Sequence, residues 1–553
     1  MKLYQDAESL HCTILSESTE RVKFKELSSP NGIHIELKPA LSPVGDTLIR
    51  VLDQSQIIDM YSRSQEILDA KIQSFCSSHE PVRKTPVNTR STKQEIRKII
   101  DNGDQANRVD VVFMGDGYTE EEKDQFFSDM DRLVQDMFND VTFRSYLPVF
   151  NIWAIYEPSV ESGIGYDGPK DTPFMLYREA GQLRAIFPGN ASYAREVCAL
   201  TGPSGCDYPS IIGNDDFYGG LGGEFVISTK GERTGTVVLR HEMGHNFVNV
   251  GEEYDGGYVY SGVNSAPSLA EVGWGHWLTG DLREERAMIR IQDYRWADLS
   301  TEGDQYFYFN SDGEYDRWHL TVSVSAAGEE DSLEFLLDGQ ILSWNTTGYD
   351  DREFYNWDGS TGFAPGDHTL VVRSKTNATH PFIPRMICSV TLHEFGNEEE
   401  FEIPNSYVSA YPTWDINGAK TLRPTNAGCL MRNMSHPLFC EVCQEGMWYQ
   451  FFMRIGLIDD VTIAEEMDPT MTRNVTVNTV GLGQLRDPEN IVDGERLEVR
   501  WFYNNLEYTG LRDQFTVQAR SGNWRVEVKL ISPEVRHDPE GLLKDSEEFF
   551  VPA

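Results

Sequence analysis

Apolar and polar residues alternate in short runs over much of the chain. Side chains of a strand point alternately to its two faces, so each run predicts a strand with one buried face. One run in the middle of the chain turns at Asp338 and Gly339, a pair typical of a tight hairpin. The alternating and strand-like runs are residues 33–37, 47–51, 320–324, 333–344, 497–503 and 524–530.

A different pattern follows the first group of predicted strands. Residues 109–114 form a short apolar run that predicts a buried strand, and residues 150–156 predict the next one. Between them, Thr119 precedes three glutamates, a composition typical of a helix N-terminus. Strand, helix and strand in this order indicate the start of an α/β domain. The predicted core face of the helix is Phe126, Met130, Leu133 and Met137.

A second helix is predicted near the middle of the chain. Val237, His241, His245 and Val248 recur at intervals of three and four residues and therefore lie on one stripe. Gly251 is its predicted C-terminal stop, because only glycine enters the left-handed conformation without penalty. The stripe stacks the two histidines one turn apart on the same face.

These histidines belong to a His-Glu-x-x-His sequence, the pattern of zinc hydrolases. Zinc binds neutral imidazoles well, so His241 and His245 are predicted metal ligands. Glu242 is rotated by about 100° from His241 around the helix, so its carboxylate can reach a water on the metal without binding the metal. The metal would lower the pKa of that water to roughly 7, and Glu242 would remove its proton during attack on a carbonyl.

A catalytic zinc usually has three protein ligands, so one more is needed. The related pattern HExxHxxGxxH places a histidine ten residues after the first one, but Gly251 occupies that position here. Glu252 and Glu253 follow directly and are the candidates. We favour Glu253 as the ligand, with Glu252 free to support the site from outside.

A downstream segment supplies a further candidate. Met431 follows Cys429 and Leu430 in a short glycine-containing segment, as expected for the Met-turn that packs below the metal in metzincins. Met434 is the second choice for this role. Without the histidine helix, a core methionine in a strand would be the better interpretation.

With both features present, the chain resembles the metallopeptidase family that includes the bacterial IgA peptidase. Members usually have Asp-Glu-Tyr after the helix, so Glu252 departs from the family pattern. The resemblance implies a zinc peptidase and does not imply immunoglobulin as its substrate. It is carried by His241-Glu242-Met243-Gly244-His245, Glu252-Glu253-Tyr254, Cys429-Leu430-Met431, Phe439-Cys440-Glu441-Val442-Cys443, Glu161-Ser162-Gly163 and residues 110–119.

The expected fold class is multidomain α+β, with a zincin- or metzincin-like catalytic domain interrupted by an insertion. From about residue 288 to 404 only strands are predicted, which indicates an inserted β-sandwich. A helix at 441–455 marks the return to the catalytic domain. The predicted units are an N-terminal mainly β domain (1–100), the first catalytic part (101–287), the insertion (288–404), the Met-turn part (405–465) and a C-terminal β-sandwich (466–553).

Composition narrows the set of partners. The chain has 48 Lys and Arg against 88 Asp and Glu, a net charge of −40, which argues against nucleic acid or an anionic membrane surface as partner. No apolar run is long enough for a membrane span, and the N-terminus lacks the apolar core of a signal peptide. A protein or peptide substrate is expected.

Eight cysteines, an even number, favour an oxidising compartment and a secreted protein. Cys198 and Cys206 are close enough in sequence to close a loop by a disulfide. Cys429 is expected to pair with Cys440 or Cys443, and a structural zinc site that includes His436 is the alternative. Five Asn-x-Ser/Thr sequences permit glycosylation, at Asn190, Asn345, Asn377, Asn433 and Asn474.

Two function hypotheses follow. The first is a zinc-dependent endopeptidase. In it, the edge strand at 224–228 would pair with an extended substrate, and the glycine-rich stretch 215–223 before it would allow close approach. A plain flexible loop is the alternative interpretation of the glycine-rich stretch. The second is a secreted carbohydrate- or protein-binding protein with an inactive zincin-like unit. Tyr355 or Trp357 of the insertion could contact glycan, although core packing is favoured for both. A zinc hydrolase of non-peptide amides is a third option.

Overall fold

The computed structural model describes residues 94–378, 380–465 and 471–553, and before them five short strands. These strands are β1 Lys2–Gln5, β2 Cys12–Ser16, β3 Thr47–Val51, β4 Ile57–Ser62 and β5 Val82–Arg83. They form one sheet in the order β3-β4-β1-β2-β5. The strand predicted at 47–51 is therefore confirmed, and the one predicted at 33–37 lies outside the described residues.

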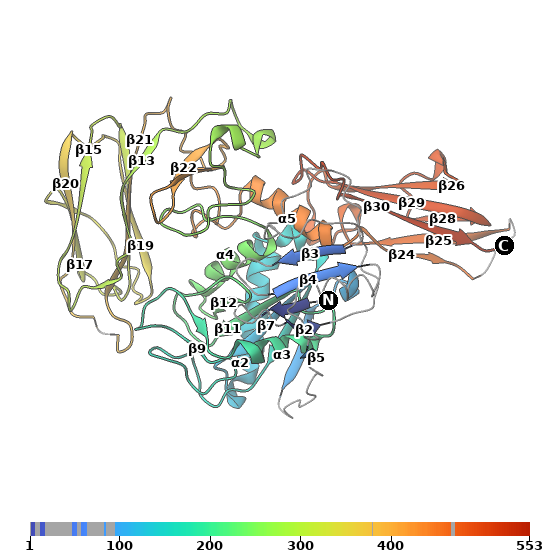
Figure 1. Cartoon of the computed structure of the whole chain (residues 1–553), viewed down its shortest axis with the longest axis horizontal. Helices are drawn as coiled ribbons and strands as arrows, with labels where there is room; N and C mark the ends of the chain where they lie inside the picture. Colours follow the sequence, from blue (N-terminus) through green and yellow to red (C-terminus); the bar gives the residue numbers. More distant parts are fainter. Residues whose placement is uncertain are drawn as a thin grey trace.

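A five-stranded sheet forms the centre of the described chain (Figure 1). Its members, in sheet order, are β12 Val226–Thr229, β11 Tyr208–Gly213, β7 Val109–Asp116, β8 Phe150–Tyr156 and β6 Glu95–Ile100. The strands are parallel except for β6, which runs antiparallel to β8. A small separate pair, β9 Leu176–Tyr177 and β10 Phe187–Pro188, lies between β8 and β11 in sequence.

Helices cover both faces of this sheet: α2 Lys123–Val134, α3 Ala191–Cys198 and α4 Gly235–Phe247. Strand β7 is buried along its whole length, and its alternate residues serve the two faces. Val111 and Phe113 pack in one core with residues of α2 and α4, whereas Val112 and Met114 pack in a second core with α3. Two-sided burial is the reason this strand is an apolar run without alternation.

The chain then leaves this unit and builds two antiparallel sheets that share one core. The hairpin between β17 and β18 turns at Asp338 and Gly339, both with positive φ, as a two-residue turn of this kind requires. One sheet contains β13 Ala287–Asp293, β21 Met386–Phe395, β16 Arg317–Val324 and β19 Glu353–Gly359, with β14 Ala297–Asp298 beside β21. The other contains β15 Gln305–Ser311, β20 Gly366–Ser374, β17 Leu333–Leu337 and β18 Gln340–Leu342.

After the hairpin β22 Tyr411–Trp414 and β23 Lys420–Arg423, helix α5 Glu441–Arg454 returns to the first core. Trp448 and Phe452 of α5 lie in the same core cluster as Trp501 and Val526 of the C-terminal strands. Figure 1 shows these strands at the opposite end of the molecule from the insertion. They are β24 Ile458–Ile463, β25 Thr472–Thr479 and β28 Thr516–Arg520 in one sheet, and β27 Leu506–Glu507, β26 Arg496–Tyr503, β29 Gly522–Ile531 and β30 Lys544–Val551 in the other.

The chain is thus multidomain, as predicted, and mostly β, with several sheets and fewer helices than the expected α+β class implies. No helix in the described part of the chain combines the length and the apolar composition that a membrane crossing needs.

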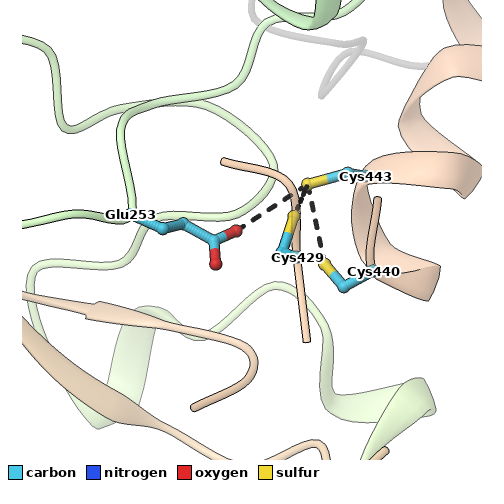
Figure 2. A group of neighbouring side chains, drawn as sticks. All are labelled: Glu253, Cys429, Cys440 and Cys443. Atoms are coloured by element: carbon cyan, nitrogen blue, oxygen red, sulfur yellow. Dashed lines mark hydrogen bonds between the residues drawn. The ribbon is translucent and has the colours of Figure 1, made fainter. Parts of the chain in front are cut away.

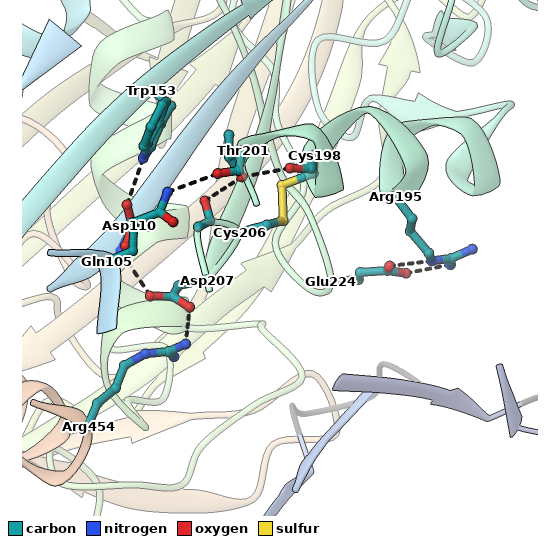
Figure 3. The surroundings of a disulfide bond; sticks show 11 residues. Gln105, Asp110, Trp153, Arg195, Cys198, Thr201, Cys206, Asp207, Glu224 and Arg454 are labelled. Atoms are coloured by element: carbon teal, nitrogen blue, oxygen red, sulfur yellow. Dashed lines mark hydrogen bonds and ion pairs between the residues drawn. A yellow bond between two sulfur atoms is a disulfide. The ribbon is translucent and has the colours of Figure 1, made fainter. Parts of the chain in front are cut away.

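One disulfide joins the end of α3 to the segment before β11 (Figure 3). Cys198 and Cys206 form it, which confirms the predicted pairing. Within the closed loop, the Thr201 hydroxyl lies 2.7 Å from the Gly205 carbonyl oxygen. A covalent link across a short loop stabilises the folded state mainly by restricting the unfolded chain.

Replacing Cys198 and Cys206 together by alanine is expected to destabilise the α/β unit by about 2–3 kcal/mol, the loop-closure contribution of a disulfide over a loop of this length. Thermal unfolding followed by circular dichroism measures the loss. The reduced wild type serves as a control and should approach the variant. An unchanged unfolding temperature in the double variant would show that the link does not contribute.

Candidate metal centre and active site

The histidine pair lies on helix α4, in the middle of the molecule. Residues 235–247 form the helix, and Val248 ends it in an extended conformation, before the predicted stop. Gly251 does not adopt a positive φ, so its predicted role as a left-handed cap is wrong. Its lack of a side chain serves close packing instead, because a Cβ there would lie 2.7 Å from the backbone nitrogen of Ser261.

Three side chains converge beside this helix. His241 Nε2 lies 3.2 Å from Glu252 Oε2, and His245 Nε2 lies 3.2 Å from Glu252 Oε1. The ligand atoms of these residues all lie within 4.8 Å of one another. Nitrogen and oxygen ligands of one tetrahedral zinc are separated by about 3.4 Å, so the arrangement fits one ion.

The opposite sides of both imidazoles are held by backbone carbonyls. His241 Nδ1 lies 3.3 Å from the Leu430 oxygen, and His245 Nδ1 lies 3.1 Å from the Val250 oxygen. A proton on each Nδ1 therefore directs the lone pair of Nε2 towards Glu252. Neutral imidazoles in this tautomer present two acceptors to a carboxylate, so either protons on Nε2 or a metal cation must lie between them to make the arrangement favourable.

The electrostatics of Glu252 agree with this need for positive charge. Burial alone would lower the pKa of His245, but the Glu252 carboxylate outweighs it and raises that pKa to about 9. Glu252 Oε2 is buried, and apart from the contact with His241 Nε2 at 3.2 Å it has no hydrogen-bond partner among the described residues. One divalent cation would satisfy both imidazoles and this oxygen together.

Glu253, the carboxylate favoured from the sequence, does not point to the histidines. It is fully buried and lies with Cys429, Cys440 and Cys443 (Figure 2). The structure therefore brings Glu252 to the histidine pair in place of Glu253. The backbone of this segment is held by hydrogen bonds from the Glu252 nitrogen to the Val259 oxygen and from the Glu253 nitrogen to the Met431 oxygen.

The predicted disulfide of Cys429 with Cys440 or Cys443 is wrong, because all three cysteines are free and buried. His436 stands apart from them, with its Nδ1 3.0 Å from the Leu438 oxygen.

Glu242 lies on the same helix as the histidines and faces the glycine-rich segment before β12. Burial raises its pKa above the ordinary value for a glutamate, which suits a group that accepts a proton. A Cβ on Gly222 would lie 2.6 Å from Glu242 Oε2, so a side chain at that position would fill the space beside the carboxylate. Glycine therefore lets this segment pack closely against the Glu242 carboxylate.

The predicted substrate-pairing edge at β12 is partly covered. Leu221 forms an antiparallel bridge with Ile227, with hydrogen bonds in both directions of 3.1 and 2.9 Å. The glycine-rich segment, and not β12 itself, therefore forms the outer edge at this point. Asn246 of α4 ties the segment down by donating to the Gly223 oxygen at 3.1 Å.

Met431 lies in a tight turn below the histidine helix. The turn is closed by hydrogen bonds from the backbone nitrogens of Arg432 and Asn433 to the Cys429 oxygen. Met431 is fully buried, and its sulfur would lie 3.2 Å from a Cβ on Gly244. Its side chain thus packs against α4 between the two histidines in sequence, while Met434 is only partly buried.

Asp255 is a central residue that the sequence patterns did not identify. Its carboxylate accepts hydrogen bonds from His393 at 2.8 Å, from Thr413 at 3.1 Å, from the Trp414 backbone at 2.9 Å and from Arg432. These partners come from β21 of the insertion, from β22 and from the Met431 turn. Asp255 therefore fixes the segment that carries Glu252 to three other parts of the fold.

Tyr218 is a second residue near the site that no motif indicated. Its hydroxyl donates to the Met434 sulfur at 3.5 Å. Burial raises its pKa, and the nearby Glu242 and Glu252 carboxylates add to this effect. The glycines that follow Tyr218 are the one feature of the sequence that could have drawn attention to it.

Other side chains considered from the sequence have structural roles. Trp274 and Trp277 are buried in the main core, and His276 pairs with Glu445 of α5 at 2.5 Å. Tyr355 and Trp357 pack against the core of the insertion, which confirms core packing for both.

Residues 97–315 match the family model described as IgA Peptidase M64. The resemblance to the IgA peptidase family is confirmed. This family is one of metallopeptidases, so peptidase activity and a protein substrate have support beyond the local geometry. The matched range contains the central sheet, α4, both glutamates and the first strands of the insertion. No curated protein matches the chain.

Comparison with solved structures finds weak likenesses. A CBM35 domain of Cellvibrio japonicus Abf62 shares 15% identity over 21% of this chain and 96% of that one, with a TM-score of 0.14. Latent PorU from Porphyromonas gingivalis shares 6% identity over 33% and 19% of the two chains, with a TM-score of 0.17. The M60 catalytic domain of Clostridium perfringens ZmpB, with its CBM51 domains, shares 10% identity over 49% and 22%, with a TM-score of 0.12. These scores are too low to assign a fold.

Glu252→Ala is expected to remove the metal of the histidine pair as completely as His245→Ala does, because both changes leave two ligands. Zinc per chain, measured by plasma mass spectrometry after gel filtration, tests this. Glu242→Gln is the matched control and should retain the metal. Undiminished zinc in Glu252→Ala would contradict the assignment of this carboxylate.

Asp255→Asn is expected to destabilise the fold by about 3 kcal/mol, because it leaves the buried Arg432 guanidinium without its anion. Asp216→Asn is the control, since it removes an ion pair with Lys230 whose carboxylate is 74% exposed, and it should change stability by less than about 1 kcal/mol. Chemical denaturation compares the two variants. Equal, small effects would show that Asp255 is not a structural centre.

Proposed function

We propose that the chain is a zinc-dependent endopeptidase with a zincin- or metzincin-like catalytic domain. The catalytic domain would comprise residues 101–287 and 405–465, with the insertion at 288–404 and flanking β domains at 1–100 and 466–553. The observation that carries the proposal is the convergence of His241 Nε2, His245 Nε2 and the Glu252 carboxylate, with both imidazoles oriented by carbonyls. The IgA peptidase family match supports it independently.

His241, His245 and Glu252 would hold the zinc ion, and Met431 would be the residue of the Met-turn beneath them. When bound, zinc supplies a Lewis acid that polarises a carbonyl and makes a water more acidic. The remaining steps fall to the chain itself. It must place an extended peptide beside α4, remove a proton from the attacking water and return a proton to the leaving amine.

Glu242 is the residue suited to both proton transfers. It follows His241 directly, so the helix presents it at the edge of the ligand set and not within it. Its raised pKa keeps its carboxylate basic enough to take a proton and its carboxylic acid able to release one. Glycine at position 222 avoids the clash that a side chain there would make with its oxygen.

The outer edge formed by the glycine-rich segment is the proposed place for substrate. An extended peptide can pair with exposed backbone groups along such an edge. The small residues there allow the two backbones to approach closely. The disulfide in the α/β unit supports secretion as the setting of this activity.

Glu242→Gln is expected to lower cleavage of an unstructured protein such as casein by about 10²–10⁴-fold, because the amide cannot take up the proton. Zinc content should stay at the wild-type value. Glu489→Gln, a change to an exposed glutamate of the C-terminal part, is the control and should cleave normally. Electrophoresis and peptide mass spectrometry detect the products.

Two results would overturn this function. Cleavage that persists in purified Glu242→Gln would exclude the proposed proton transfers. A zinc-loaded wild type that cleaves no protein substrate, and binds glycan or protein instead, would favour the alternative of a binding protein with an inactive catalytic unit.

A further inference from the structure

A second cluster of metal-binding side chains lies apart from the histidine pair. Cys429, Cys440, Cys443 and Glu253 converge from three segments, and Figure 2 shows their ligand atoms directed at one another. All four residues are buried, with exposed fractions between 0% and 2%. Three thiols and a carboxyl group in one closed space form a ligand set of the kind that holds structural zinc.

The spacing of the four ligand atoms supports this interpretation. Cys429 and Cys443 have their sulfurs 3.8 Å apart, and the sulfurs of Cys440 and Cys443 are 3.6 Å apart. The Cys443 sulfur lies 3.9 Å from Glu253 Oε1. In a tetrahedral zinc site with ordinary bond lengths, two sulfurs are about 3.8 Å apart, and a sulfur and an oxygen about 3.6 Å. These three separations agree with edges of a coordination tetrahedron, and all four ligand atoms lie within 4.8 Å of one another.

The carboxylate of Glu253 is oriented for such a site. Asn264 donates to its Oε1 at 2.9 Å and also binds the backbone of Gly251 on both sides. Glu253 Oε2 is buried and has no hydrogen-bond partner among the described residues. In metal sites, a residue outside the ligand set typically orients a metal ligand by a hydrogen bond, as Asn264 does for Glu253. The unpaired Oε2 of Glu253 remains available to a metal ion.

The surroundings also suit negatively charged thiolates. Cys440 is the N-cap of α5 and Cys443 lies in its first turn, where the helix dipole favours negative charge. The guanidinium group of Arg432 donates to the Glu253 backbone oxygen at 2.9 Å and adds positive charge nearby. A buried set of thiolates and a carboxylate needs such compensation together with a cation.

We propose that Cys429, Cys440, Cys443 and Glu253 bind a structural Zn²⁺ ion, separate from the ion of the histidine pair. Two neighbouring glutamates would then serve two metals, Glu252 the catalytic one and Glu253 the structural one. Redox activity fits this Cys-x-x-Cys pair poorly, because all three thiols are closed off from solvent.

The structural ion would align the active site from below. Cys429 is followed by Leu430, whose carbonyl orients His241, and Met431 accepts a hydrogen bond from the Glu253 backbone at 3.2 Å. An ion bound to Cys429 and Glu253 therefore fastens together the turn and the segment that contribute to the histidine site. The positions of Glu252 and His241 would both depend on it.

Zinc per chain in the full-length protein, purified without chelator, tests the proposal. We expect about two equivalents in the wild type and about one each in Cys440→Ala/Cys443→Ala and in His241→Ala/His245→Ala. Cys388→Ala is the matched control, because Cys388 is a buried free cysteine of the insertion. It should retain both ions.

Cobalt substitution in the His241→Ala/His245→Ala variant gives a readout that leaves the cysteines intact. Intense near-ultraviolet absorption from thiolate-to-cobalt charge transfer is expected there. Absence of this band, or a single zinc in the wild type that the histidine changes remove entirely, would overturn the proposal. So would a disulfide among the three cysteines in the unreduced protein by mass spectrometry. Neither readout depends on cleavage, so failure of the proposed peptidase activity is distinguishable from failure of this site.

Discussion

The opposite orientation of two adjacent glutamates is the constraint on which the site depends. Glu252 turns to His241 and His245, and Glu253 turns to the three cysteines. The backbone nitrogen of Glu252 donates to Val259 and that of Glu253 donates to Met431, so the segment is held from both sides.

The site is assembled from segments that are distant in sequence. Helix α4 supplies the histidines and Glu242, while the turn at Met431 comes nearly two hundred residues later, after the whole insertion. Asp255 joins these parts through buried charge, with partners in the insertion and in the turn. Strand β21 is therefore attached through Asp255 to the segment that carries Glu252 and to the Met431 turn.

Local patterns in the sequence predicted much of this architecture. The histidine helix, the buried strand β7, the hairpin at Asp338 and the disulfide at Cys198 each depend on a few neighbouring residues, and each is present. The choice between Glu252 and Glu253 depends on how the chain leaves the helix. Helix α4 ends at Phe247, before the predicted stop at Gly251, and the sequence does not determine the path of the chain from there to the two glutamates. Local sequence patterns did not indicate Asp255 and Tyr218, because the residues that contact them lie far away in the sequence.

A crystal structure with anomalous data on both sides of the zinc absorption edge tests the central claim most directly. We expect a zinc peak about 2.0–2.2 Å from His241 Nε2, His245 Nε2 and a Glu252 carboxylate oxygen. A peak bound by the histidines together with Glu253, or no zinc between the histidines in active protein, would contradict it.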